Sequence, residues 1–182
     1  MGKTQGKQKP AHILNNTEIY GIIGVCMNTT SPVESEASVS IESASLRDLT
    51  SLRHLEQVCF PKDAWPLMDL IGVLTFPGVI RLKAVNSREM VGFIAGDIRR
   101  LEGLAWIATV GVLPEYRGRG IGSALLQACE NKISVARIRL CVRLSNDTAI
   151  RLYERRGYTR VGEWSRYYQD GESALVMEKK KI

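Results

Sequence analysis

A glycine-rich segment between two apolar stretches holds the first residues whose types and spacing suit the binding of a charged group. It runs from Arg117 to Ser123 and reads R-G-R-G-I-G-S. Glycine has no Cβ, so a ligand can come close to the backbone here. The apolar spacing that follows predicts a helix from Arg119 to about Lys132, whose first turn would leave N–H groups without partners at its positive end. These features predict a site for a phosphorylated ligand, with Arg117 and Arg119 as charged donors.

The loop differs from two well-known nucleotide-binding motifs. It contains neither G-x-x-x-x-G-K-[ST] nor G-x-G-x-x-G. It does contain R-x-x-G-x-G, from Arg117 to Gly122, after a strand-like run that ends near Val112. A tight turn from strand to helix, without any ligand, is the alternative interpretation of the same residues.

A second candidate segment runs from Leu140 to Tyr158. Asn146 is the predicted N-cap of a helix that ends at Gly157, a residue suited to a left-handed stop. Tyr153 lies seven residues after Asn146, about two turns further along the same helix face, so both side chains could reach one extended ligand. Alternatively, Asn146 only caps the helix and Tyr153 only packs.

The elements that must position these residues follow from hydrophobic periodicity and turn residues. Strands are predicted at 39–44, 79–85, 90–99, 104–112, 137–144, 158–161 and 173–178, and helices at 46–60, 67–74, 119–132 and 146–156. The three strands between residues 79 and 112 are joined by short turns, which predicts an antiparallel meander. The strand, helix and strand after residue 104 should pair in parallel. The prediction is one α/β (α+β) domain, residues 38–182, with a mixed sheet of six to seven strands and flanking helices.

Residues 1–37 are predicted to be an N-terminal extension, partly disordered or packed on a partner. Their apolar run from Ile19 to Met27 resembles a signal peptide but is too short to span a bilayer. We favour an extension over a secretion signal and expect a cytoplasmic protein without membrane attachment.

The composition of the 182-residue chain suits one globular domain, with 45% apolar residues and a net charge of +6. Eight arginines lie between Arg137 and Arg166 and are opposed by three acidic residues. This basic region could hold cofactor phosphates, an acidic partner or RNA, or it could be a solvated surface. The cysteines (Cys26, Cys59, Cys129 and Cys141) and two histidines show no metal-ligand spacing, so no metal is expected.

Together, R-x-x-G-x-G at Arg117–Gly122 and S-N-x-x-A-I-x-L-Y at Ser145–Tyr153 resemble the GNAT superfamily of N-acetyltransferases, over about Val39 to Glu178. Within it the chain is most similar to the ribosomal-protein-alanine and other protein N-terminal acetyltransferases. That likeness rests on Phe60-Pro61 with Trp65, on V-R-L-S-N, and on the ending Y-Y-Q-D-G-E-S-A-L-V-M-E.

The resemblance implies acetyl-CoA as cosubstrate and a splayed pair of parallel strands. It implies pantetheine contacts from Asn146 and from the strand residues Val110, Gly111 and Val112. Pyrophosphate contacts would come from Arg117, Gly118, Arg119, Gly120, Ile121, Gly122 and Ser123. Tyr153 would lie near the sulfur and protonate the leaving thiolate. Tyr167 and Tyr168 would help line the acceptor groove. The corner that carries Phe60 and Trp65 is either packing between two helices or a wall of that substrate groove.

One residue departs from the family pattern. The ribosomal-protein-alanine enzymes have a carboxylate where this chain has Cys141, and some relatives have histidine. Cysteine could accept a proton only if its pKa were lowered, for which Arg139 and Arg143 are candidates on the same strand face. A water relay, or a carboxylate such as Asp97 or Glu102, is the favoured alternative. Direct transfer needs no acyl-enzyme on Cys141.

Three functional hypotheses remain open at this point. The favoured one is acetyl transfer to a primary amine, above all a protein N-terminus. The second is the same reaction on a small-molecule amine. The third is a non-catalytic acyl-CoA-binding module that docks on RNA or the ribosome through its arginines. No DNA partner is expected, ribosome association is left open, and the sequence does not determine the oligomeric state.

Overall fold

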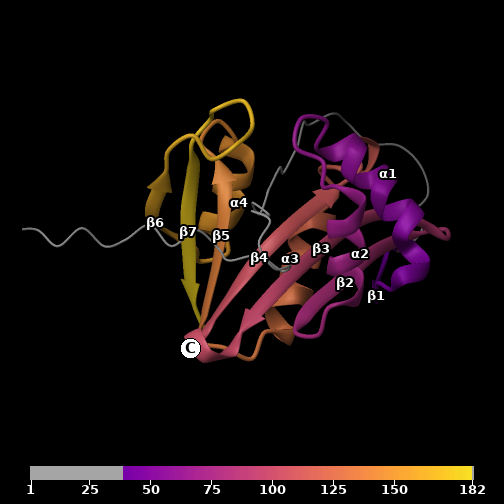
Figure 1. Cartoon of the computed structure of the whole chain (residues 1–182), viewed down its shortest axis with the longest axis horizontal. Helices are drawn as coiled ribbons and strands as arrows, with labels where there is room; N and C mark the ends of the chain where they lie inside the picture. Colours follow the sequence, from indigo (N-terminus) through magenta and orange to yellow (C-terminus); the bar gives the residue numbers. More distant parts are fainter. Residues whose placement is uncertain (1–38, 182) are drawn as a thin grey trace, which may run out of the picture.

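The computed structural model describes residues 39–181, which form one mixed sheet with helices on both faces (Figure 1). The predicted extension, residues 1–37, lies outside the described residues. Within 39–181 the seven strands are β1 Ser40–Ser43, β2 Val79–Asn86, β3 Glu89–Arg99, β4 Leu104–Val112, β5 Arg137–Arg143, β6 Thr159–Trp164 and β7 Ala174–Lys180. The α-helices are α1 Leu49–Cys59, α2 Leu67–Thr75, α3 Ile121–Lys132 and α4 Asp147–Arg155.

The strand order is β1-β2-β3-β4-β5-β7-β6. The predicted meander is confirmed, since β2, β3 and β4 pair antiparallel in sequence order. The predicted parallel pair is also confirmed, because β5 follows the crossover helix α3 and lies parallel to β4. The sheet therefore joins two antiparallel halves, β1–β4 and β5–β7, through one parallel contact.

That parallel contact is short. Pairing between β4 and β5 covers only Leu104 with Arg137, Ala105 with Ile138, and Trp106 with Arg139. β4 continues to Val112 along β3, while β5 continues to Arg143 along β7. The two strands meet at one end of the molecule and diverge towards the other (Figure 1). The predicted splay is thus present.

The helices lie on opposite faces of the sheet. On α3, the predicted apolar stripe of Ile121, Leu125, Leu126 and Cys129 is buried in a core that also includes Ala149, Ile150 and Tyr153 of α4. The other face of β3 and β4 is covered by α1 and α2, whose buried side chains form a separate core around Leu52, Leu55 and Leu70. One face therefore carries α3 and α4, and the other carries α1 and α2.

Several predicted boundaries differ from the structure, and three of them have a clear local reason. Residues 46–48 form a 3-10 turn, closed by a hydrogen bond from Ser45 N–H to Asp48, and α1 begins only at Leu49. Helix α3 begins at Ile121 instead of Arg119, because Gly118 and Gly120 have φ values of +78° and +79°. The strand predicted at 158–161 runs to Trp164, since it pairs with β7 over that length.

Candidate active site

The glycine loop presents a row of unused backbone donors at the start of α3. Gly118 and Gly120 both have left-handed φ, and a Cβ added at either glycine would meet nothing within 4 Å. Within residues 39–181, the N–H groups from Gly118 to Ser123 have no hydrogen-bond acceptor; the first helical bond is from Ala124 N–H to Gly120 O, at 3.0 Å. Such a concave array at the positive end of a 12-residue helix suits an anion.

The two arginines of this loop are engaged with the protein itself. Arg117 Nε donates to Val112 O at 2.9 Å, and its Nη2 lies 4.0 Å from Cys59 Sγ. Arg119 Nη2 donates to Glu115 O at 3.1 Å, and its guanidinium lies over the Tyr116 ring. Arg117 therefore fixes the loop to the end of β4 and to α1, and the structure favours the backbone as the main anion donor.

The end of β4 lies between two packed helices. Val110 and Val112 point into the core shared with α3. Gly111 points the other way, and a Cβ there would lie 2.9 Å from Leu55 Cδ2 and 3.3 Å from Cys59 Sγ, so side chains of α1 would have to shift for a larger residue. Beyond Trp106, the edge of β4 that faces β5 has no strand partner within the described part of the chain. This free edge is where the predicted pantetheine contacts would form.

Helix α4 brings Asn146 and Tyr153 to the β5 side of the gap. Asn146 is the N-cap, as predicted, and its Oδ1 accepts from Ala149 N–H at 3.1 Å. Tyr153 is 0% exposed, and its Oη is buried without a hydrogen-bond partner among residues 39–181. Burial raises the pKa of this phenol above its ordinary value. An unpaired buried hydroxyl is costly, so this oxygen is available to hydrogen-bond a bound group.

The environment of Cys141 argues against its predicted role as proton acceptor. Burial raises the pKa of the Cys141 thiol to about 12, against weaker opposing effects of a hydrogen bond with Tyr167 and the charge of Arg139. The two arginines expected to lower that pKa have carboxylate partners. Arg139 Nε lies 2.6 Å from Glu178 Oε2, and Arg143 pairs with three carboxylates. The thiol therefore stays protonated at neutral pH.

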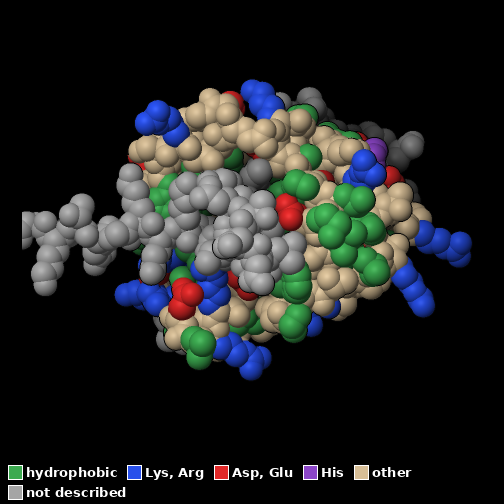
Figure 2. Space-filling model, viewed as in Figure 1, with side chains coloured by type: hydrophobic (Ala, Val, Ile, Leu, Met, Phe, Trp, Pro, Cys, Tyr) green, Lys and Arg blue, Asp and Glu red, His purple; other side chains and the backbone are tan. Residues whose placement is uncertain are grey.

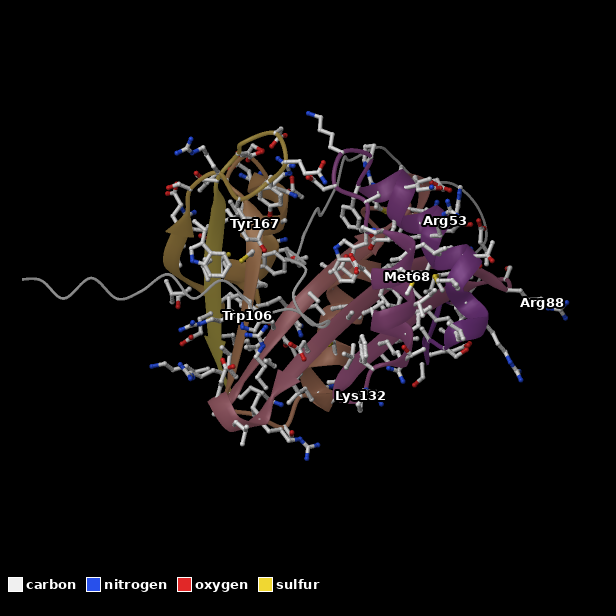
Figure 3. All side chains as sticks on the ribbon, viewed as in Figure 1. Arg53, Met68, Arg88, Trp106, Lys132 and Tyr167 are labelled. Carbon is white, nitrogen blue, oxygen red and sulfur yellow. The ribbon has the colours of Figure 1, made fainter. Side chains whose placement is uncertain are left out.

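An aromatic cluster covers the point where β4 and β5 separate. It consists of Trp106, Trp164, Tyr167 and Tyr168, and it packs on Cys141. The ring centroids are 5.6 Å apart for Trp106 and Trp164, 5.4 Å for Trp164 and Tyr167, and 5.1 Å for Tyr167 and Tyr168. Figure 3 shows Trp106 and Tyr167 beside β5 and β7. The sequence interpretation missed both tryptophans. The sequence feature that could have pointed to Trp106 is its place near the start of the strand predicted at 104–112, whose later residues were predicted to bind the cofactor.

The structure divides the predicted acceptor residues into two groups. Tyr167 and Tyr168 belong to the aromatic cluster, whereas Phe60 and Trp65 are buried in the core beneath α1 and α2. Arg143 links the groups. Its guanidinium pairs with Asp63, in the loop that carries Trp65, and with Asp170 and Glu172 after β6 (residues 159–164). It also lies 3.9 Å from the centroid of the Tyr168 ring.

The carboxylates considered as alternative bases are both associated with Arg99. Asp97 lies opposite Trp106 on β3, and its Oδ2 is 3.1 Å from Arg99 Nε. Glu102 lies in the 3-10 turn Arg100–Glu102 before β4, 3.9 Å from Arg99 Nη1. That turn is at the paired end of β4, away from the diverging segment.

The model of the acetyltransferase (GNAT) family matches residues 49–158, which include α1, the glycine loop and α4. The chain belongs to the GNAT acetyltransferase family. An uncharacterized N-acetyltransferase of Methanocaldococcus jannaschii is 36% identical to this GNAT protein over 146 residues, covering 78% of the chain and 91% of the relative. The N-alpha-acetyltransferase RimI of Mycobacterium tuberculosis is 40% identical over 146 residues, covering 78% and 92%.

Among solved structures, the ribosomal-protein-S18-alanine N-acetyltransferase from Escherichia coli aligns with a TM-score of 0.72 at 26% identity, covering 79% of this chain and 94% of that one. These likenesses confirm the predicted fold and the predicted family. They also confirm the enzyme class, an acyltransferase that uses acetyl-CoA. Among the described residues of this GNAT protein, no three His, Cys, Asp or Glu side chains are grouped so that they could hold a metal ion. The helices of residues 39–181 include none with the length and hydrophobicity of a membrane span.

Proposed function

We propose that this GNAT protein transfers the acetyl group of acetyl-CoA to the α-amine of a protein N-terminus. The observation that carries the proposal is the divergence of β4 and β5 beyond Trp106 and Arg139. The gap has the anion-binding loop at the end of β4, the unpaired Tyr153 hydroxyl on its α4 side, and the aromatic cluster over it. These features fit a long, diphosphate-bearing thioester whose reactive end meets an acceptor beside the cluster.

The glycine loop would hold the diphosphate through the N–H groups of Gly118 to Ser123, with the dipole of α3 adding to the attraction. The free edge of β4 would bind the amide-bearing arm as a strand partner, a role assigned to Val110, Gly111 and Val112. Asn146 would border the same arm from the start of α4. Acetyl-CoA supplies an activated acyl group, and the protein's own residues orient it.

Acyl transfer develops a negative charge on two atoms in turn. The carbonyl oxygen of the thioester becomes an oxyanion, and a backbone N–H on the free edge of β4 is the donor we assign to it. The sulfur then leaves as a thiolate. Tyr153 Oη is a buried proton donor without another partner in the described chain, so it can protonate that thiolate.

The acceptor side fits a polypeptide better than a free small amine. The named relatives are an N-alpha-acetyltransferase and a ribosomal-protein-S18-alanine N-acetyltransferase. Directly after the loop that carries Asp63 and Trp65, Leu67 and Met68 at the start of α2 are exposed, and Figure 2 shows hydrophobic side chains gathered over this helix. A peptide extending from the aromatic cluster could contact this apolar surface, whereas a polyamine or amino acid would be too short.

The test is thiol release from acetyl-CoA with three sets of acceptors. These are peptides with a free N-terminus, the same peptides with a blocked N-terminus and an internal lysine, and free polyamines and amino acids. We expect turnover with the first set, with mass spectrometry placing the acetyl group on the α-amine. Turnover confined to the free amines would support the small-molecule alternative, and acetyl-CoA binding without turnover on any amine would support a non-catalytic module.

A further inference from the structure

Glu56 on α1 is a buried carboxylate that faces the diverging part of β4. It is 1% exposed, and its Oε1 accepts a hydrogen bond from Thr109 Oγ1 at 3.2 Å. The backbone N–H of Trp65 donates to the same carboxylate. The second oxygen, Oε2, is buried without a hydrogen-bond partner among residues 39–181. A buried oxygen left unpaired is costly, and a proton or a donor bound beside it would relieve that cost.

No cation compensates this carboxylate in the described structure. β4 has no ionisable side chain between Leu104 and Val112. On α1, Arg53 and His54 are exposed. Lys62 lies near Asp170, Arg117 lies near Cys59, and Arg143 pairs with Asp63. The remaining ionisable group on these elements, Asp69 of α2, is not a cation. Burial and two neutral hydrogen bonds thus dominate the electrostatics of Glu56.

A second buried carboxylate in the same domain shows the contrast. Glu130 on α3 is 5% exposed and lies 3.2 Å from Arg156 Nη2 and 2.8 Å from Lys179 Nζ. Two cations therefore balance the charge of Glu130, although its Oε1 has no hydrogen-bond partner among residues 39–181. Glu56 is instead bonded to a hydroxyl of the strand that forms the gap.

We propose that Glu56 accepts the proton that the acceptor ammonium must lose, and that the Thr109 hydroxyl passes it on. The inference rests on the proposed function, because it assigns a role within that reaction. Thr109 lies three residues beyond Trp106, on the part of β4 that no longer pairs with β5. Its hydroxyl already donates to Glu56, so the last step of the proposed proton path, from Thr109 to Glu56, is formed in the resting protein.

Every proton has a destination in this sequence of steps. Thr109 Oγ takes one proton from the ammonium as its own hydroxyl proton passes to Glu56, which leaves a neutral amine. The amine nitrogen bonds to the acyl carbon, the C–S bond breaks, and its electron pair stays on sulfur. Tyr153 protonates the sulfur and recovers a proton lost by the nitrogen. Glu56 finally releases its proton to solvent.

The ionisation of Glu56 agrees with this geometry. Burial raises the pKa of this carboxyl from its ordinary value of 4.5 to about 7, against the weaker effects of the hydrogen bonds from Trp65 and Thr109. A proton acceptor is most effective when its pKa lies near the operating pH.

The test compares the wild type with E56Q, T109V, T109S and E130Q, using an N-terminal peptide acceptor at about pH 5.5 to about pH 9. The kcat/KM of the wild type should rise through about pH 7. E56Q and T109V should lose about 100-fold or more in kcat/KM and no longer show that rise. T109S should keep the wild-type kcat/KM and its rise with pH, because it retains the hydroxyl. E130Q, the buried control, should keep the wild-type pH profile, and calorimetry should give unchanged acetyl-CoA affinity for E56Q.

The opposite outcomes are as clear. If E56Q keeps the pH profile and only the KM for peptide rises, Glu56 merely holds the loop around Trp65, and the proposal is overturned. If T109V has the same kcat/KM and pH profile as T109S, the relay through the Thr109 hydroxyl is overturned. Unchanged acetyl-CoA affinity would show that T109V is still folded. If the wild type acetylates no amine at all, the proposed function itself fails, and this assignment fails with it.

Discussion

Trp106 of β4 lies opposite Arg139 of β5, and this pair is the last at which the two parallel strands remain joined. The Arg139 guanidinium lies 6.0 Å from the Trp106 ring, at the base of the gap. Everything assigned to the reaction lies on the diverging side of that pair: the glycine loop beyond β4, Tyr153 on α4, and Thr109 with Glu56.

The glycine loop should bind acetyl-CoA through backbone geometry that only glycine adopts easily. G120A places a Cβ on a residue with φ +79°, which costs about 1–2 kcal/mol in the native conformation. We expect loss of acetyl-CoA affinity by about tenfold or more, measured by calorimetry. G103A is the matched control, because Gly103 has φ +60° and equal space but lies in the turn before β4. Equal loss of affinity in both variants would contradict the assignment.

Removing the Tyr153 hydroxyl should separate activity from stability. Y153F deletes an oxygen that has no partner in the described chain, so the free energy of unfolding should stay the same or rise. The kcat should fall by about 100-fold or more, because the thiolate loses its proton donor. Y158F, which deletes the hydroxyl of the ring 5.7 Å away, serves as the control and should keep kcat. A Y153F enzyme with normal kcat would remove Tyr153 from the reaction.

Cys141 should prove dispensable for catalysis. Since burial raises the pKa of its thiol to about 12, almost no thiolate exists at pH 8. C141A should therefore keep kcat within about threefold, and Cys141 should react with a maleimide only after unfolding. Mass spectrometry of the labelled peptide checks the second point. A 100-fold loss of kcat in C141A would restore Cys141 as a candidate proton acceptor.

Arg143 should stabilise the loops on both sides of the acceptor face. R143M would leave Asp63 buried and unpaired, which costs about 3 kcal/mol. Although burial raises it, hydrogen bonds from Ser145 and then from Arg143 lower the pKa of the Glu172 carboxyl below its ordinary 4.5. The hydrogen bond from Arg143, and then that from the Glu172 N–H, lower the pKa of Asp170 below its ordinary 3.8. A lowered pKa means that stability is present above the unfolded pKa and is lost as the pH falls through the folded one. Urea unfolding of the wild type should therefore show a loss of stability below about pH 4. The loss should be smaller in R143M than in the wild type.

Glu56 should produce the opposite pH dependence. Its raised pKa means that the folded state prefers the protonated carboxyl, so its contribution is fully present below about pH 4.5 and is lost as the pH rises to about 7. The shift corresponds to about 3 kcal/mol. E56Q cannot ionise, so its free energy of unfolding should change less than that of the wild type between these values. Parallel urea curves for the two proteins would contradict the buried, ionisable state of Glu56.

Local patterns in the sequence were sufficient for most elements. The strand at 104–112 was predicted with its observed ends, and Asn146 and Gly157 bound α4 as expected. The glycine spacing pointed to the loop before α3, because φ values near +80°, as at Gly118 and Gly120, are adopted easily by glycine. Boundaries failed where a 3-10 turn or a strand partner decided them, as at residues 46–48 and 161–164.

The sequence by itself determined the order of strands and helices, the glycine loop and the family, because periodicity, caps and motifs are properties of neighbouring residues. Only the tertiary structure decided which distant side chains meet. Thr109 and Glu56 are 53 residues apart, and their contact requires α1 to pack on β4 at Gly111. The pairing register of β4 shifts between Ile107 and Thr109, and no local pattern predicts that shift. Desolvation then raises the pKa values of Glu56 and Cys141, because burial is a property of the packed chain.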